Sequence, residues 1–110
     1  MRRAEVYRKE YAIAECPGDI ESPTVLAAQT ANELLDISGI KASFVLTVYE
    51  GKIYLSARSI DEVNVQIIAE KLGGGGHINS AGAQFDHTNI QEVITILKET
   101  IDEMIEEGDI

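Results

Sequence analysis

Four consecutive glycines at positions 73–76 and the histidine after them, His77, are the residues in this sequence whose types and spacing best suit chemistry. A glycine loses more backbone entropy on folding than any other residue, and a helix needs only one glycine to end. The additional glycines therefore predict a tight turn or a close approach of the backbone to a ligand. Uncovered main-chain amides form a concave site for an anion, and His77 can donate hydrogen bonds to phosphate from either ring nitrogen.

The spacing of the glycines excludes the familiar nucleotide-binding loops. A dinucleotide-binding G-x-G-x-x-G pattern would need a third glycine at Ile78 or Asn79, and no Gly-Lys-Ser/Thr triplet follows as in a P-loop. Ser80 and Gly82 are small enough to permit close packing, and we expect residues 78–82 to form a short helical turn whose first amides add to the anion site. A flexible loop that merely ends a helix is the alternative.

Arg58 is the second group suited to phosphate, because its planar guanidinium matches phosphate oxygens and it stands at the end of an expected strand. A surface salt bridge is the alternative role for this side chain. The sequence contains two histidines and one cysteine, and it shows no cluster of acids at ligand spacing and no nucleophile motif. We therefore predict no catalytic residue and no metal site in this chain.

The composition describes one acidic domain. The 110 residues carry 9 Lys and Arg against 19 Asp and Glu, a formal net charge of -10 at pH 7. This charge argues against an extended nucleic-acid-binding face but permits a small phosphate site built from backbone amides. The single cysteine excludes an intrachain disulfide and fits a reducing compartment. Since the sequence shows no signal peptide and no apolar run of about 20 residues, we expect a cytoplasmic domain without direct membrane contact.

Hydrophobic periodicity predicts a mixed β-sheet flanked by helices, an α/β (α+β) fold. A short apolar strand is expected at residues 11–16, and residues 42–49 are expected to pair with residues 53–59 as a hairpin. A further short strand is expected at residues 83–85. The expected order is strand, helix, hairpin, helix, glycine loop, strand, helix.

Three helices are expected to pack on this sheet. The first begins at Pro23 behind a Ser22 cap and runs to about Asp36. The second follows a cap at Ser59 or Asp61 and ends at the glycine run. The third spans residues 90–107 after a capping box of Thr88 and Gln91. The apolar stripes at helical spacing are Val25, Ala28, Ala31 and Leu35 in the first helix, Val65, Ile68, Ala69 and Leu72 in the second, and Ile90, Val93, Ile94, Leu97, Ile101, Met104 and Ile105 in the third.

Several segments resemble one known family. Residues 73–82 resemble the GGGH-x-x-A-A/G signature of the DHH-associated C-terminal domain of DHH-family phosphoesterases. Residues 39–45 resemble the G-V-x-A-S-F-V segment of GdpP-type cyclic di-AMP phosphodiesterases, and residues 56–59 and 64–66 resemble their S-A-R-S and N-V-Q segments. The resemblance covers roughly residues 24–102.

This resemblance implies a two-domain enzyme of which residues 1–110 are a single substrate-binding domain, not catalytic alone. In the family, a DHH domain holds two manganese ions and performs the hydrolysis, while the associated domain closes over the cleft and holds the nucleotide. The partners implied are a DHH domain in the same protein and a nucleotide or short oligonucleotide, with cyclic di-AMP or a pApA-like dinucleotide as the substrate. The residues to which the resemblance assigns substrate binding are Arg58, Ser59, Asn64, Gly73, Gly74, Gly75, Gly76, His77 and Ser80.

Other functions stay open at the level of sequence. Within the same family, the chain would be an accessory domain of a nano-RNase with pAp-phosphatase activity or of a RecJ-like exonuclease. A different class is a noncatalytic RNA-binding module, as in the related C-terminal domain of alanyl-tRNA synthetase, which the acidic charge disfavours. A third is a pure interaction domain. The sequence also leaves open the base preference, formation of a homodimer, and whether the parent protein is anchored in a membrane with this domain on the cytoplasmic side.

Overall fold

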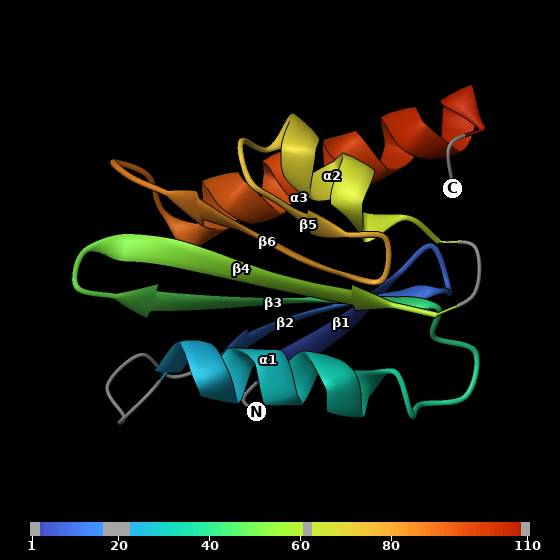
Figure 1. Ribbon diagram of the computed structural model, residues 1–110, viewed down its shortest axis with the longest axis horizontal. Helices are drawn as coiled ribbons and strands as arrows, with labels where there is room; N and C mark the ends of the chain where they lie inside the picture. The colour runs from blue at the N-terminus through green and yellow to red at the C-terminus, as the bar shows by residue number, and fades with distance from the viewer. Residues whose placement is uncertain (1–2, 17–22, 61–62, 109–110) are drawn as a thin grey trace.

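The computed structural model of this chain describes residues 3–16, 23–60 and 63–108. In these ranges a six-stranded sheet forms the middle layer, with one helix on one face and two on the other (Figure 1). The strands are β1 (Arg3–Tyr7), β2 (Tyr11–Cys16), β3 (Ala42–Tyr49), β4 (Lys52–Ser59), β5 (Gly75–His77) and β6 (Ser80–Phe85). The helices are α1 (Pro23–Leu34), α2 (Val65–Lys71) and α3 (Ile90–Glu107).

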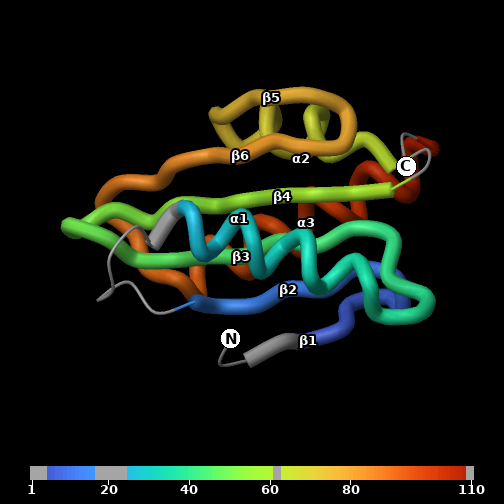
Figure 2. The backbone as a smooth tube through the Cα atoms, turned by 60° about the horizontal axis from the view of Figure 1, so that its bottom comes forward, coloured from blue at the N-terminus to red at the C-terminus, as the bar shows by residue number. Residues whose placement is uncertain are grey.

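The strand order is β1-β2-β3-β4-β6-β5, so that β1 and β5 form the two edges of the sheet (Figure 2). Strands β2 and β3 are parallel and are connected through α1, whereas every other neighbouring pair is antiparallel. This mixed sheet with helices on both faces confirms the predicted fold class. No helix in the described ranges is long and apolar enough to cross a lipid bilayer.

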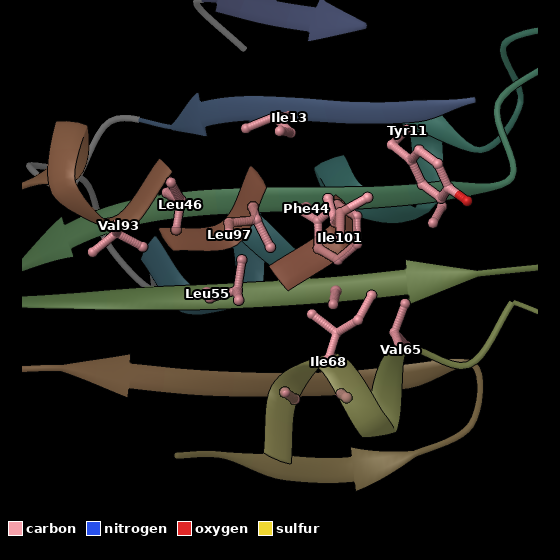
Figure 3. Packing of buried hydrophobic residues seen from close by; sticks show 14 of the residues in the cluster. Tyr11, Ile13, Phe44, Leu46, Leu55, Val65, Ile68, Val93, Leu97 and Ile101 are labelled. Carbon is pink, nitrogen blue, oxygen red and sulfur yellow. The ribbon is translucent and has the colours of Figure 1, made fainter. Parts of the chain in front are cut away.

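Two hydrophobic cores lie on opposite faces of the sheet, because successive strand residues point to opposite faces. The larger core lies between the sheet and helices α2 and α3 (Figure 3), and its largest members include Phe44, Leu46, Leu55, Ile68, Leu97 and Ile101. The smaller core lies under α1 and consists of Ala12, Ala14, Cys16, Ala27, Ala31, Leu34, Ile40 and Val45. Along β4, therefore, Leu55 and Ala57 face the larger core, while Ser56 and Arg58 face the side of α1.

Local signals predicted the long hairpin and the last helix well. Glu50 and Gly51 have φ angles of 51° and 79°, the left-handed pair of a two-residue type I′ turn, and β4 begins at Lys52, one residue earlier than expected. Helix α3 covers the predicted residues 90–107 and ends at Gly108, which has a φ of 78°. A continuous apolar stripe at a period of 3.6 residues was sufficient to define this helix.

The first helix and the first strand differ from the prediction. Helix α1 begins at Pro23 as expected but ends at Leu34, and Val25, expected on its apolar stripe, is 54% exposed. The residues that α1 buries are Ala27, Thr30, Ala31 and Leu34. Edge strand β1 was not predicted. The expected caps Ser22 and Asp61 lie outside the described residues.

The two later helices begin with asparagine caps instead of the expected residues. The Asn64 side chain accepts a hydrogen bond from an amide in the first turn of α2, and the alternative cap, Ser59, is the last residue of β4. The Asn89 side chain does the same for α3, directly after Thr88. Asparagine is as good an N-cap as serine or threonine, so residue type alone did not decide between neighbouring candidates.

Candidate functional site

The glycine run starts as the end of α2. Gly73 has a φ of 93°, a left-handed conformation that glycine adopts without a Cβ penalty. The Gly73 amide donates to the Glu70 carbonyl at 3.1 Å, and the Gly74 amide donates to the Ala69 carbonyl at 2.7 Å. These two amides thus satisfy carbonyls in the last turn of the helix.

The glycines that follow form an edge strand. Residues 75–77 pair antiparallel with β6, which begins at Ser80 after a two-residue turn. The expected helical turn at residues 78–82 is therefore wrong, as is the expected start of this strand at Ala83. Glycine is a poor strand former, and its lack of side chains hides the alternation by which a strand is recognised.

Close approach of β5 to β6 explains two of the glycines but not a third. A Cβ at Gly74 would lie 2.0 Å from the Gly82 carbonyl oxygen, and a Cβ at Gly76 would lie 2.5 Å from the Ala81 Cα. Gly76 also has a φ of 147°. At Gly75, by contrast, φ is outside the left-handed region and a Cβ would meet no atom within 4 Å. Neither conformation nor packing requires glycine at position 75, and the space above it is open.

Three of the predicted site residues form one row across the sheet. Arg58 on β4 is the cross-strand partner of Ser80 on β6, and Ser80 is the partner of His77 on β5. Directly opposed residues of antiparallel strands place their side chains on the same face. His77 and Ser80 are exposed, and Arg58 is partly exposed. A guanidinium, a hydroxyl and an imidazole thus extend side by side, and each can donate a hydrogen bond to an anion.

Helix α1 covers this face only as far as β4. It packs on β2, β3 and β4, and Figure 2 shows β6 and β5 beyond it. Ser43 on β3 is the other cross-strand partner of Arg58; it is 0% exposed and donates to the Ala31 carbonyl of α1 at 2.6 Å. The row therefore passes from core to surface at Arg58.

Two residues that the sequence reasoning did not select lie on the same face beside this row. Gly82 on β6 is the partner of Gly75 on one side and of Ser56 on the other. None of these side chains exceeds a serine in size, so only short side chains project from the sheet next to the row. The signals were present in the sequence: Gly82 belongs to the glycine signature, and Ser56 precedes Arg58 by two positions on one strand, which places both on one face.

Ser59 faces away from this row. It is 6% exposed and lies opposite Ala42 of the larger core. Its hydroxyl donates to the Val63 carbonyl at 2.7 Å and accepts from Nδ2 of Asn79 at 2.9 Å. Ser59 is thus part of the interior beneath the turn between β5 and β6.

Asn64 also makes a bond within the fold. Its Oδ1 accepts from the Ile67 amide at 3.2 Å and so caps α2.

Of the predicted site residues, the structure brings Arg58, Ser80 and His77 together on one face of the sheet, with Gly75 beside them. The remaining predicted residues make the contacts within the fold described above: Ser59, Asn64, Gly73, Gly74 and Gly76.

The two arginines Arg58 and Arg8 have contrasting partners. Nη1 of Arg58 donates to the Ala57 carbonyl at 2.8 Å, and no carboxylate in the described ranges forms an ion pair with Arg58. Arg8, near β1, instead lies 2.7 Å from the Asp102 carboxylate. Hydrogen bonds from Tyr7 and Arg8 hold the pKa of Asp102 below its usual value, and the Asp102 carboxylate raises the pKa of Arg8. Of these two arginines, Arg8 is the one that pairs with a carboxylate among the residues that the structure describes.

The comparison with protein families gives one match over most of the chain. The family model described as the DHHA1 domain matches residues 9–104. The chain is 44% identical over 99 residues to the cyclic-di-AMP phosphodiesterase PdeA of Listeria monocytogenes, a match covering 89% of this chain and 15% of that protein. It is also 44% identical over 115 residues to the cyclic-di-AMP phosphodiesterase GdpP of Geobacillus thermodenitrificans, covering 98% of this chain and 18% of that protein. The chain thus spans less than a fifth of these relatives.

Solved structures share the fold. An exopolyphosphatase-related protein from Bacteroides fragilis superposes with a TM-score of 0.80 at 20% identity. That match covers 92% of this chain and 31% of the other. At this identity the similarity shows a common fold and nothing further.

Proposed function

This chain belongs to the DHHA1 domain family, and from that premise we propose that it is the substrate-binding domain of a DHH-family phosphodiesterase. The proposed substrate is cyclic di-AMP, for which the two relatives are named, or the linear dinucleotide pApA. The domain's task is to hold the phosphate of the dinucleotide in the cytoplasm while another part of the protein cleaves it.

The row of Arg58, Ser80 and His77 is the observation that carries this proposal. Arg58 lies on β4, the last strand that α1 contacts, and Ser80 and His77 lie on the two strands beyond it. Guanidinium and imidazole groups bind phosphate oxygens through charge-assisted hydrogen bonds, which are stronger than bonds between neutral groups. The absence of a side chain at Gly75 leaves room for a phosphate and its ribose to lie close to the sheet.

Hydrolysis is assigned to a part of the protein outside this chain. Among the described residues there is no group of three or more His, Cys, Asp or Glu side chains that could hold a metal ion, so these residues do not fit a manganese pair. We place the manganese ions and the hydrolytic residues in a DHH domain of the same protein. The chain on its own is accordingly expected to hydrolyse no dinucleotide, with or without added manganese.

A titration of the chain with pApA, followed by NMR of backbone amides, tests the proposal and suits the weak affinity expected of half a site. The largest shifts are expected on β5, β6 and the end of β4. Arg58→Ala is expected to weaken binding about tenfold to a hundredfold, because it removes hydrogen bonds to a charged group worth about 1.5–3 kcal/mol. Parallel titrations with pAp and a short RNA compare the alternative substrates of the family.

Arg8→Ala is the matched control. It removes the same charge at the β1 edge, where Arg8 is paired with Asp102, and is expected to leave the affinity for pApA unchanged. The proposal fails if the two substitutions weaken binding equally, which would show a nonspecific effect of charge. It also fails if the amide shifts gather on α3 or β1 and not on β5 and β6.

A further inference from the structure

The turn between β5 and β6 determines where His77 and Ser80 lie, because its two residues, Ile78 and Asn79, connect them. This turn is attached to the rest of the fold through its main chain. The Ile78 carbonyl accepts from the amide of Val65, the first residue of α2, at 2.9 Å. The Asn79 carbonyl accepts from the Ser59 amide at 3.1 Å. The turn is thus bonded both to α2 and to the end of the strand that carries Arg58.

A directional chain of side-chain hydrogen bonds reinforces this attachment. The Ser59 hydroxyl has one proton, and the nearer of its two acceptors is the Val63 carbonyl at 2.7 Å, against 3.3 Å for the Ile78 carbonyl. The same hydroxyl oxygen accepts from Nδ2 of Asn79 at 2.9 Å. Ser59 therefore donates and accepts at once, which a hydroxyl can do and an alanine side chain cannot.

We infer that Ser59, together with Asn79, is a positioning residue for the phosphate-binding row, an inference that rests on the proposed function. Ser59 does not reach the exposed surface itself, since it points into the larger core. It acts by fixing the turn that carries His77 and Ser80 against the strand end that carries Arg58. Without its hydroxyl, the turn keeps only its main-chain bonds, so the three donors are held less firmly relative to one another and the ligand must order them when it binds.

Another buried serine shows what a purely structural role would look like. Ser43 is 0% exposed, and its hydroxyl donates to the Ala31 carbonyl, so that it attaches β3 to α1. Ser59 makes a comparable buried bond, but its partners include the turn beside the proposed ligand. Ser43→Ala and Ser59→Ala therefore both remove a hydroxyl from a buried position, and only the second loosens the row.

The test compares pApA affinity and ligand-free amide spectra of the two variants at a temperature far below both unfolding transitions. Ser59→Ala is expected to bind pApA roughly tenfold more weakly, since misplaced groups lose this much or more. It is also expected to shift the amides of residues 77–80 before ligand is added. Ser43→Ala should retain the affinity and those amide positions of the unmodified chain. Ser59→Thr keeps the hydroxyl and is expected to restore binding.

Asn79→Ala is the second variant, because Asn79 is exposed and its loss should not prevent folding. It is expected to weaken pApA binding less than Ser59→Ala does, and to shift amides in the same turn.

Equal affinities for Ser59→Ala and Ser43→Ala, with Arg58→Ala still impaired, would overturn the inference and leave the proposed function standing. If the unmodified chain binds no dinucleotide, the proposed function fails. In that case an unchanged amide of His77, which neither substitution touches directly, in both Ser59→Ala and Asn79→Ala would remove the positioning role as well.

Discussion

Helix α1 divides one face of the sheet into two halves that can be compared position by position. Ser43 on β3 and Ser80 on β6 stand on either side of Arg58 in the same cross-strand row. Ser43 lies under α1 and makes a buried hydrogen bond to it, whereas Ser80 is exposed beyond the helix. Residue type and strand register are identical for the two serines, so the extent of α1 decides which half serves the core and which is open to a ligand.

The glycines repeat this contrast within the open half. Gly74 and Gly76 permit the close contact of β5 with β6, and Gly75 between them touches nothing that a side chain would disturb. The run of glycines thus combines positions where the fold requires glycine with one position, Gly75, where neither packing nor backbone conformation requires it. Substitutions that affect either folding or ligand binding, but not both, test this contrast between the covered and the open half of the sheet face.

Gly74→Ala is expected to have the largest effect on stability. Its Cβ would overlap backbone atoms of β6 at 2.0 Å, so β5 must move or detach, at a cost of about 3 kcal/mol or more in the free energy of unfolding. Chemical denaturation measures this loss. Gly75→Ala is the control, and its free energy of unfolding should stay within about 1 kcal/mol of that of the unmodified chain. It should nevertheless bind pApA more weakly, because the new methyl group fills the open space beside the row. Similar losses of stability for both variants would remove the distinction between the two glycines.

Ser43→Ala and Ser80→Ala are expected to act on different properties. Ser43→Ala loses a buried hydrogen bond and should lower the free energy of unfolding by about 1–2 kcal/mol. Ser80→Ala should change it by less than about 0.5 kcal/mol, as is usual at the surface, while weakening the binding of pApA. Urea titrations measure the free energy of unfolding of each variant, and NMR titrations measure its affinity for pApA. A stability loss for Ser80→Ala as large as that for Ser43→Ala would contradict the division of this face.

Features with strong local signals were predictable from the sequence. The Glu50-Gly51 turn takes up the left-handed angles that its residue types favour, and the long apolar stripe of α3 defined its full length. The residue types and the family resemblance predicted binding roles for Arg58, His77 and Ser80, and these roles stay a prediction; the structure adds that the three lie in one cross-strand row. Period-two alternation would also have shown that Ser59, next to Arg58 on one strand, must face the opposite side.

Features decided by tertiary contacts were not predictable in this way. The glycine run contains no alternating side chains, so its pairing with β6 becomes visible only from the register of the two strands. Edge strand β1 depends on distant partners, because Tyr7 and Arg8 bond to Asp102 of α3. The boundary of α1 over the sheet, which makes Ser80 accessible and Ser43 inaccessible, likewise depends on packing between segments far apart in the chain.

Asn64 offers a smaller test, since it was predicted to bind substrate and is found as the cap of α2. Asn64→Ala is expected to lower the free energy of unfolding by about 1 kcal/mol, because an amide in the first turn loses its acceptor. Asn64→Ser keeps a capping oxygen and should retain most of the stability. Thermal unfolding of both variants measures the cap. Affinity for pApA then separates the roles: if Asn64→Ser is stable but binds poorly, Asn64 contacts the ligand in addition to capping the helix.

The smallest expected effect concerns pH and contrasts the paired Arg8 with Arg58, the proposed phosphate-binding arginine. Bonds from Tyr7 and Arg8 lower the pKa of Asp102 below its ordinary value of 3.8. A carboxylate whose pKa is lower in the folded state adds stability above its ordinary pKa, and this contribution disappears as the pH falls through the lowered value. The unmodified chain should therefore lose more stability than Asp102→Asn between neutral pH and the acid range below 3.8.

Urea titrations at a series of pH values measure this difference, with Glu103→Gln, an exposed neighbour on the same helix, as the control. The effect should be slight, because the Arg8 and Asp102 side chains are 46% and 36% exposed, and added salt should reduce it further. At neutral pH, Asp102→Asn should leave pApA affinity unchanged, since this cluster lies at the β1 edge, opposite β5. Because Asp102→Asn removes a negative charge, an effect of the overall charge of the domain would strengthen the binding of anionic pApA. A gain of affinity in Asp102→Asn equal in size to the loss in Arg58→Ala would mean that Arg58 acts through that overall charge. The separation between a stabilising edge and a binding edge of the sheet would then be lost.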